Sequence, residues 1–350
     1  MIQKESHRRF NPLNSEWILV SPHRTQRPWQ GKLESHIQAV DSEYKSDCYL
    51  CPRNKRANGE INPNYNSTFV FDNDFSSLKK DMINFIVNDS ELIKGKSEIG
   101  ICRVVCFSPK HNLTLAELEV NDIIQIIRTW QSEYSSLGSK SFINYVQIFE
   151  NKGEIMGCSN PHPHGQIWAQ ETIPTEPAKE QVNQLQYYKE KNATLLSDYI
   201  NLEKQKQERV IYENESFILL VPFWAVWPFE TMIISKRKIN NILQLNEEEV
   251  EQFAEILKRT TVKYDNIFNV PFPYSSGIHQ SPTDDLEHPE WHFHMHFYPP
   301  LLRSASIKKF MVGYEMLGEP QRDITPERSA EILKDVDSVH YSLKMINETK

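Results

Sequence analysis

The sequence lacks the features that mark nucleic-acid-binding, membrane-spanning and secreted proteins. Its 350 residues carry 39 Lys and Arg against 47 Asp and Glu, and the net charge of −8 predicts no basic surface for nucleic acid. No run of about 18 apolar residues is present, so no membrane span is expected. Residues 1–9 have no apolar core of a signal peptide. We therefore expect a cytoplasmic protein with neither a membrane nor a nucleic-acid partner.

Cysteine is scarce, and no Gly- or Ser-rich linker divides the chain. Five cysteines, an odd number without a secretion signal, are typical of reduced thiols in the cytosol. The length suits one large domain or two medium ones with a sizeable core. Since no flexible linker appears, we expect two structural units to pack against each other rather than to move independently.

The order of predicted elements repeats along the chain. Each half runs through a strand, a short polar turn, an amphipathic helix and a second strand to a strand of alternating polar residues. The offset is about 130 residues, the separation of His164 from His294. The strands fall at 101–107, 142–149 and 162–166 in the first half and at 231–235, 271–279 and 291–298 in the second. We predict an α+β fold of two tandem halves, residues 1–175 and 176–350, with antiparallel sheets and flanking helices.

Capping signals predict where the helices begin. Apolar residues at helical spacing predict a helix that starts between 114 and 121, where Thr114 and Glu117 can form a capping box. Asn246 and Glu249 are expected to cap the equivalent helix of the second half. Thr175 is the expected N-cap of the helix-prone stretch 176–209. Residues 79–98, rich in Lys, Asp and Ser, are expected to form a loop.

The stretch 157–168, Gly-Cys-Ser-Asn-Pro-His-Pro-His-Gly-Gln-Ile-Trp, carries the main functional signal. Side chains two residues apart share a face of a strand, so His162, His164 and Gln166 present polar groups to one side. Proline between the histidines disfavours a helix. A single histidine in a strand is usually structural. Two histidines and a glutamine on one face, behind a Gly-Cys-Ser-Asn-Pro turn, favour a functional site.

A CxxC pair, Cys48 and Cys51, precedes a polar loop. A redox pair usually opens a helix, and the loop-like residues after Cys51 favour half of a zinc site instead. His111, just after a strand, and His162 would complete a tetrahedral Cys₂His₂ set, which suits a structural zinc ion. Uncoordinated thiols are the alternative, and the spacing favours zinc over them only modestly.

If His162 binds a metal, His164 is free to act as a nucleophile. A neutral imidazole that attacks phosphorus forms a covalent N-nucleotidyl intermediate and divides one displacement into two. Gln166 offers an NH₂ donor, and Ser159 a hydroxyl, to the developing phosphoryl charge. Gln166 cannot act as an acid, which is tolerable when the leaving group is itself a phosphate. The pattern therefore favours transfer between phosphates over hydrolysis.

A second cluster is predicted around His294 and His296, which alternate with His292. His279 lies 15 residues before His294, and a carboxylate such as Glu180 would complete a nitrogen-rich site for iron or zinc. The alternative is a histidine strand buried by aromatic residues, which is nearly as good an explanation of the pattern. His292 takes the place of His162 in the repeat but need not share its role.

These stretches give the chain a family resemblance. It resembles the class I galactose-1-phosphate uridylyltransferases of the histidine-triad superfamily over nearly its whole length, in stretches 10–13, 17–31, 48–51, 157–168, 221–231 and 296–317. The resemblance implies two histidine-triad-like halves and a ping-pong reaction of galactose metabolism. UDP-glucose would give its UMP to His164 and release glucose 1-phosphate. Galactose 1-phosphate would then accept the UMP and form UDP-galactose.

The resemblance also implies roles for individual residues. It assigns zinc to Cys48, Cys51, His111 and His162, and iron or zinc to Glu180, His279, His294 and His296. It implies a homodimer in which the partner's C-terminal segment completes each active site. The substrate contacts that it implies are Arg24, Arg27, Ala57, Asn73, Asp74, Asn151, Ser159, Gln166, Lys309, Phe310, Val312, Tyr314, Glu315 and Gln321. From the residues alone, the proline-rich loop of Arg24 and Arg27 is better explained as solvent-exposed.

Two other functions fit parts of the pattern. A histidine-triad nucleotide hydrolase or a dinucleoside-phosphate phosphorylase would use the same nucleophile, but Gln166 in place of a third histidine counts against hydrolysis. A zinc-stabilised nucleotide-binding module would bind UDP-sugars without turning them over. Exchange of label between glucose 1-phosphate and UDP-glucose distinguishes the transferase from both.

Overall fold

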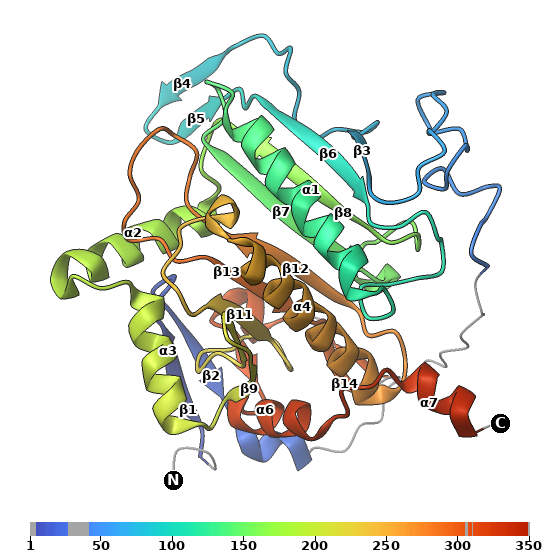
Figure 1. Cartoon of the computed structure of the whole chain (residues 1–350). Coiled ribbons are helices and arrows are strands. Elements are labelled where there is room, and N and C mark those ends of the chain that lie inside the picture. The colour runs from blue at the N-terminus through green and yellow to red at the C-terminus, as the bar shows by residue number, and fades with distance from the viewer. Residues whose placement is uncertain (1–4, 27–41, 305–306, 310, 349–350) are drawn as a thin grey trace.

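The chain folds around a nine-stranded sheet, in a computed structural model that describes residues 5–26, 42–304, 307–309 and 311–348 (Figure 1). The strands are β3 (Phe69–Asp72), β6 (Gly100–Cys106), β7 (Tyr145–Lys152), β8 (His164–Gln170), β9 (Val210–Glu213), β10 (Phe217–Leu220), β11 (Thr231–Ser235), β12 (Tyr274–His279) and β13 (His294–Tyr298). Their order is β3-β6-β8-β7-β12-β13-β11-β10-β9. Every neighbouring pair is antiparallel. The predicted α+β class with an antiparallel sheet is confirmed.

Strands from the two repeats meet in the middle of this sheet. β7 pairs with β12, from Lys152 opposite Tyr274 to Ile148 opposite Ile278. Outward from that pair, β8 and β6 follow on one side, and β13 and β11 follow in the mirrored order on the other. The histidine strands β8 and β13 therefore occupy equivalent places, each flanked by the two other strands of its own repeat.

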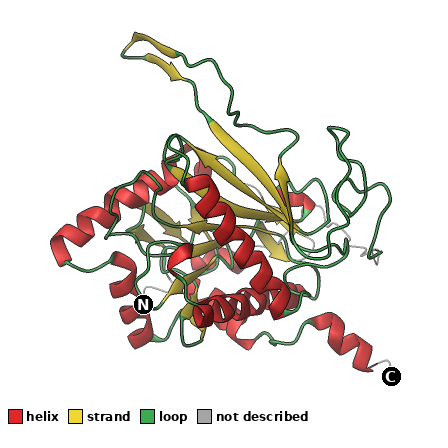
Figure 2. Cartoon of the chain, turned by 45° about the horizontal axis from the view of Figure 1, so that its top comes forward, coloured by secondary structure: helices red, strands yellow, loops and turns green. Residues whose placement is uncertain are grey.

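Two long helices, α1 (Val120–Gly138) and α4 (Glu247–Phe268), lie side by side over one face of the sheet (Figures 1 and 2). Trp130 and Phe253 from these helices are buried in a core with Ile148 and Ile278 from the central strands. Among the described residues, no helix is both long and apolar enough to cross a bilayer. The other helices are α2 (Thr175–Lys191), α3 (Leu195–Lys206), α5 (Tyr314–Leu317), α6 (Pro326–Asp335) and α7 (Tyr341–Glu348).

The helix starts agree only partly with the capping signals. Asn246 and Glu249 form the expected capping box at α4. Thr114 donates its backbone N–H to the Glu117 carboxylate, but this pair closes a turn ahead of α1, whose N-cap is Glu119. Thr175 is the first residue of α2, and Pro174 occupies the N-cap position. The physical reason for both shifts is that an extended residue just before the helix takes the cap position without a side-chain bond.

Smaller sheets flank the central one in the described residues. β16 (Gln321–Arg322) joins β2 (Glu16–Val20) in parallel, and β2 pairs with β1 (His7–Asn11), so segments near both ends of the chain lie together. β14 (Leu301–Ser304) pairs with β15 (Ile307–Lys309). Short 3₁₀ helices form at Pro22–Gln26, Glu154–Met156 and Ile242–Gln244.

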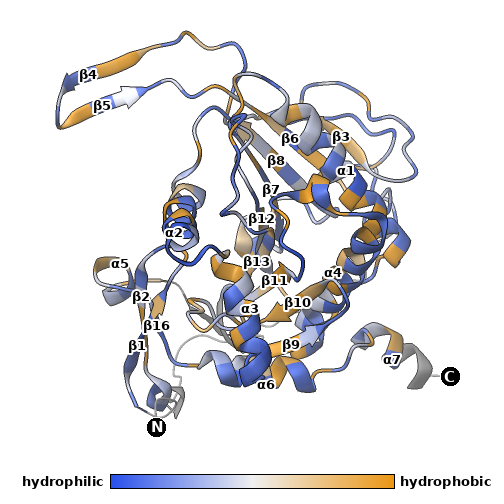
Figure 3. Ribbon diagram, turned by 60° about the vertical axis from the view of Figure 1, so that its left-hand side comes forward, coloured by the Kyte–Doolittle hydropathy of each residue, from blue (hydrophilic) through white to orange (hydrophobic). Residues whose placement is uncertain are grey.

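The prediction of a loop at 79–98 was wrong, because this stretch forms a hairpin of β4 (Ile86–Ser90) and β5 (Ile93–Lys96). The hairpin projects from the body of the molecule (Figures 2 and 3). Its side chains are exposed on both faces, so no buried, alternating apolar face marks the strands in a composition rich in Lys, Asp and Ser.

A buried carboxyl group on the helix side of the sheet makes stability depend on pH. Burial raises the pKa of Glu150 to about 7, although Lys152 and the Tyr274 hydroxyl oppose the rise. A folded-state pKa above the unfolded value means that stability is lost as pH rises from about 4.5 through 7. We expect Glu150→Gln to raise the unfolding free energy more at pH 8 than at pH 5, by at most about 3 kcal/mol.

Urea unfolding at the two pH values measures this difference. The exposed Glu154, changed to Gln, is the matched control and should give the same small change at both pH values. An equal change for Glu150→Gln at pH 5 and pH 8 would contradict the prediction.

Candidate active site and metal centres

His164 opens strand β8 with one ring nitrogen fixed and the other available. Its Nδ1 donates to the carbonyl oxygen of His162 at 2.7 Å. The tautomer with a proton on Nδ1 leaves the Nε2 lone pair without a proton. Burial lowers the pKa of the His164 ring, which favours the neutral form. A neutral, oriented imidazole with a bare Nε2 has the properties of a nucleophile.

His164 faces a small pocket of about 40 Å³, lined by Asn151, Gly157, Cys158, Ser159, His164, Gly165 and Gln166. Gly157 turns the chain with a φ of 78°, a conformation that favours glycine. A side chain at Gly165 would meet the Phe107 ring at 2.7 Å, so only glycine lets β8 lie this close to its neighbour. Both glycines thus shape the pocket in which the histidine lies.

Gln166 follows His164 on the same face, as the alternation predicted. Its Oε1 accepts hydrogen bonds from Trp168 Nε1 at 3.0 Å and from Asn73 Nδ2 at 3.5 Å. The amide oxygen is therefore occupied, and the NH₂ group remains available. Asn151, on β7, accepts from the Ser275 hydroxyl at 2.7 Å through its Oδ1, which likewise leaves its NH₂ group available.

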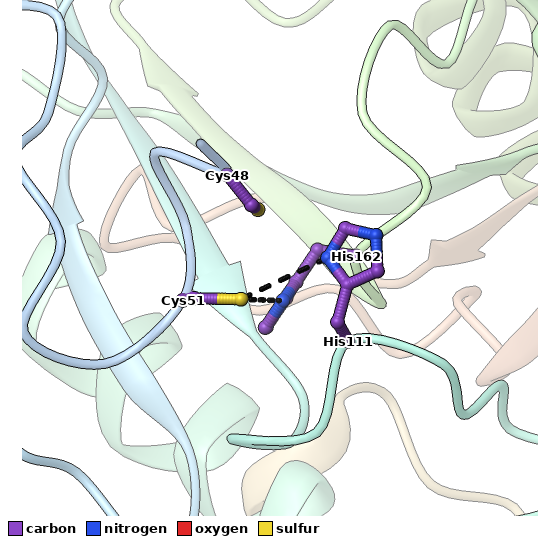
Figure 4. A group of neighbouring side chains, drawn as sticks. All are labelled: Cys48, Cys51, His111 and His162. Carbon is purple, nitrogen blue, oxygen red and sulfur yellow. Dashed lines mark hydrogen bonds between the residues drawn. The ribbon is translucent and has the colours of Figure 1, made fainter. Parts of the chain in front are cut away.

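The four predicted ligands of the first cluster converge (Figure 4): Cys48, Cys51, His111 and His162. All four are buried, and their donor atoms lie within 4.8 Å of one another. Cys51 Sγ is 3.5 Å from His162 Nδ1 and 3.8 Å from His111 Nδ1. Tetrahedral zinc bonds to sulfur and nitrogen would place such atoms roughly 3.5 Å apart. The donor set and its spacing fit a tetrahedral metal ion.

The protonation of His162 also suits metal binding. Its Nε2 lies 2.8 Å from the Ser108 carbonyl oxygen and 3.1 Å from the Tyr65 hydroxyl. A carbonyl oxygen only accepts, so Nε2 carries the proton and Nδ1 turns its lone pair to the cysteines. Burial lowers the pKa of His162 to about 4 and raises that of Cys51 to about 11. A buried cation would favour the thiolate that burial alone disfavours.

The second predicted cluster also converges, from Glu180 on α2, His279 on β12, and His294 and His296 on β13. Glu180 Oε1 lies 2.9 Å from His279 Nδ1 and 3.5 Å from His296 Nε2, and Oε2 lies 3.3 Å from His294 Nε2. Burial opposes ionisation of Glu180, but His279 and His294 hold its pKa well below the usual range. The buried His294 Nε2 and Glu180 Oε2 have no hydrogen-bond partner. A carboxylate oxygen and a ring nitrogen that lack hydrogen-bond partners are suitable ligands for a second metal ion.

The repeat places His292 where His162 stands, with a different environment. Its Nε2 donates to the Ser235 carbonyl at 2.6 Å, as His162 does to Ser108. Its Nδ1, however, accepts from the Thr194 hydroxyl, the N-cap of α3, at 2.9 Å. His292 therefore keeps the backbone contact of His162 and lies outside both clusters.

The other predicted contacts divide into two groups. Asn73 contacts Gln166, and Asp74 Oδ2 accepts from the backbone of Asn58, beside the exposed Ala57. The second group lies at the small sheet of β1, β2 and β16, beside α5 (Figure 3). There Arg24 and Gln321 both donate to Asp323, and Glu315 pairs with Arg322. Val312 and Tyr314 are exposed at α5. Lys309 lies in β15, and Arg27 and Phe310 lie outside the described residues. None of the C-terminal group lines the pocket at His164 in the described chain.

Three neighbours of the site were missed in the sequence. Trp168 continues the alternation of His164 and Gln166, and that spacing could have revealed it. Asn160 lies in the same stretch and contacts Cys48 Sγ at 3.5 Å through Nδ2. Tyr65, which contacts His162, has no local signal, because its role depends on packing between distant segments.

Solved structures share this fold at low sequence identity. One, described as a uridylyltransferase, has a TM-score of 0.74 and 24% identity, and the match covers 93% of this chain and 97% of that one. An ADP-glucose phosphorylase from Arabidopsis thaliana with bound ADP-glucose has a TM-score of 0.75 and 23% identity, with 95% and 100% covered. The chain shares the fold of these two proteins, and within it His164 is oriented by a hydrogen bond from its Nδ1 to a backbone carbonyl.

The chain belongs to the galactose-1-phosphate uridylyltransferase family. Models of the N- and C-terminal domains of galactose-1-phosphate uridyl transferase match residues 1–174 and 179–345. Galactose-1-phosphate uridylyltransferases of Saccharomyces cerevisiae and Haemophilus influenzae are 50% and 48% identical to it over 96% of this chain, and over 96% and 95% of their own. The enzyme of Rattus norvegicus is 43% identical over 97% of this chain and 90% of its own. The resemblance seen in the sequence is confirmed, and the chain is a uridylyltransferase of galactose metabolism.

Proposed function

We propose that the enzyme transfers UMP from UDP-glucose to galactose 1-phosphate by a ping-pong mechanism. His164 Nε2 attacks the α-phosphorus, an N–P bond forms, and the bond from that phosphorus to the bridging oxygen breaks. The electron pair leaves with glucose 1-phosphate. A phosphate oxygen of galactose 1-phosphate then attacks the same phosphorus, breaks the N–P bond and restores the neutral imidazole, and UDP-galactose is released.

The observation that carries this proposal is the hydrogen bond from His164 Nδ1 to the His162 carbonyl, which leaves Nε2 free in the pocket. The same bond stabilises the ring once Nε2 is bonded to phosphorus and positive charge develops on it. Gln166 and Ser159 supply donors to the phosphoryl oxygens. A phosphate leaving group needs little protonation, so the absence of an acid at Gln166 favours transfer over hydrolysis.

Metal ions serve structure in this proposal. Zinc is held by Cys48, Cys51, His111 and His162, and a second ion, iron or zinc, by Glu180, His279, His294 and His296. A four-ligand zinc site has no open position for substrate and supplies a rigid cross-link. The first site would join the 48–51 loop to the residue two before the nucleophile. The second would fasten α2 to strands of the second half.

We further propose a cytoplasmic homodimer built from two histidine-triad-like halves per chain, with active sites shared between subunits. The pocket at His164 is small, and the C-terminal residues implied as substrate contacts do not line it within the described chain. Lys309, Phe310, Val312, Tyr314, Glu315 and Gln321 would then reach the sugar phosphate of the partner subunit. Arg24, Arg27, Ala57, Asn73, Asp74 and Asn151 would complete the substrate contacts.

Isotope exchange tests the covalent mechanism. With UDP-glucose and labelled glucose 1-phosphate, and no galactose 1-phosphate, we expect label to enter UDP-glucose at a rate comparable to turnover, because the first half-reaction is reversible. The His164→Gly protein is the control for contaminating activity. Full turnover with galactose 1-phosphate but no exchange would overturn the covalent mechanism, and steady release of UMP alone would indicate a hydrolase.

A further inference from the structure

We propose that Trp168 is a positioning residue for the transfer, which fixes the side-chain amide of Gln166 so that its NH₂ group faces the reacting phosphoryl group. This inference rests on the proposed function and assigns a task to a residue outside the pocket lining. Gln166 is useful as a donor only when its NH₂ end, and not its oxygen, points at the phosphate. The protein must therefore favour one of the two orientations of the Gln166 amide, which have nearly the same shape.

The indole of Trp168 determines which orientation of the Gln166 amide is favoured. Its Nε1–H lies 3.0 Å from Gln166 Oε1, and an indole N–H can only donate. The atom opposite it must be the amide oxygen. Asn73 Nδ2 approaches the same oxygen at 3.5 Å, and Asn73 is itself oriented because its Oδ1 accepts from the backbone of Phe75 at 2.9 Å. Two donors on one oxygen exclude the flipped amide.

The strands paired with β8 offer no substitute for Trp168, and the contact from Asn73, at 3.5 Å, is longer and weaker than the one at 3.0 Å from Trp168. Directly across from Gln166 stand Val104 on β6 and Phe149 on β7, whose side chains have no hydrogen-bonding groups. Trp168 shares the face of Gln166 because it lies two residues further along β8. Its ring packs edge-on against Phe149, with centroids 5.7 Å apart and planes at 78°. This contact holds the indole in place, so the direction of its N–H is set by packing.

An amide free to flip would present its oxygen to the phosphoryl oxygens for part of the time. Like partial charges would then meet where a donor is needed, and the transition state would lose one stabilising bond. The expected loss is in the chemical step, because the pocket and the nucleophile are unchanged.

The test is Trp168→Phe, which keeps an aromatic ring and removes the N–H, assayed by single-turnover formation of the uridylyl-enzyme. We expect a rate roughly 10- to 50-fold below that of the unaltered enzyme, less than the roughly 10²- to 10³-fold of a lost donor. The KM for UDP-glucose should change less than about three-fold, which separates positioning from binding. Trp17→Phe is the control. Trp17 is a half-exposed tryptophan on β2, far from Trp168 in the sequence, and its change should leave the rate unchanged.

A double-mutant cycle separates positioning from a structural role. If Trp168 acts through Gln166, then Trp168→Phe should slow the Gln166→Ala protein less than about two-fold. An equal slowing in both backgrounds, or an unaltered rate for Trp168→Phe alone, overturns the inference. If Trp168→Phe does not fold, benzothienylalanine at position 168 has nearly the shape of tryptophan without its N–H and replaces it in the same cycle. If Gln166→Ala reacts at the normal rate, the inference fails, because the amide that Trp168 orients is then not needed. If the unaltered protein forms no uridylyl-enzyme, the proposed function itself fails.

Discussion

His164→Gly is expected to abolish measurable uridylyl transfer while the fold remains intact. The substitution removes the nitrogen that would bond to phosphorus, and no other neutral imidazole lines the pocket in the described chain. Loss of a covalent nucleophile lowers kcat by at least about 10⁴-fold in enzymes whose groups act together. His164 is only partly buried and its ring donates to the nearby His162 carbonyl, so removal of the ring costs the core little.

Three measurements establish this outcome. Steady-state turnover should fall below detection, thermal unfolding should shift by no more than a few degrees, and calorimetric titration should still show UDP-glucose binding. His23→Gly, at an exposed histidine of the first 3₁₀ helix, controls for the loss of an imidazole and should keep full activity. Turnover within ten-fold of the unaltered enzyme would remove His164 from its role. A binding module without catalysis would instead show no turnover in either protein.

Much of the site was predictable because it depends on local sequence patterns. The alternation of His164 and Gln166 requires only that side chains two apart share a face of a strand, and β8, which begins at His164, meets that condition. His162 lies before the strand and is buried in the first cluster. The capping box of Asn246 and Glu249 is equally local. Both metal clusters were also predicted, although their ligands come from distant segments, because the family resemblance supplied the long-range information that spacing alone lacks.

The features that the sequence could not predict depend on packing between distant segments. The contact of Tyr65 with His162 spans 97 residues, and nothing around Tyr65 indicates it. The 86–96 hairpin has no buried face, so the periodicity that identifies strands is absent there. The amide orientation of Gln166 depends on which atoms of Trp168 and Asn73 approach it, and residue types at a given spacing do not determine that geometry.

The two repeats show how one framework acquires different chemistry. In both, the first histidine of the pair donates to a backbone carbonyl, and the second donates Nδ1 to the carbonyl of the first, His164 to His162 and His294 to His292, each at 2.7 Å. Nε2 is therefore the ring nitrogen that the second histidine presents to its surroundings in each half. Beside His164 that nitrogen opens onto a pocket, whereas beside His294 it meets the Glu180 carboxylate at 3.3 Å. Under the proposed function, the neighbouring group, and not the histidine itself, decides between nucleophile and metal ligand.

Cys48→Ser should remove one equivalent of zinc and lower stability by roughly 3–5 kcal/mol, or about 10 °C in Tm, if the proposed site is filled. A serine hydroxyl is a poor zinc ligand. The remaining ligands, Cys51, His111 and His162, would stay buried without a metal cation to bind. Besides a small apolar cluster, the side chains of Asn54, Asn62 and Tyr65 hold the loop that carries both cysteines, by hydrogen bonds to its backbone carbonyls. The cross-link is therefore expected to contribute much of its hold on the sheet.

Metal analysis by plasma mass spectrometry and thermal unfolding measure the two effects on the same preparations. Cys102→Ser is the matched control, since Cys102 is a buried free cysteine outside the cluster, and it should keep its zinc. Activity should fall with zinc in Cys48→Ser, because His162 both binds the ion and provides the carbonyl that orients His164 at 2.7 Å. An unchanged zinc content would refute the site. Lost zinc with full stability would show that the ion is bound without serving as a cross-link, since the fold would then hold the loop by its own contacts.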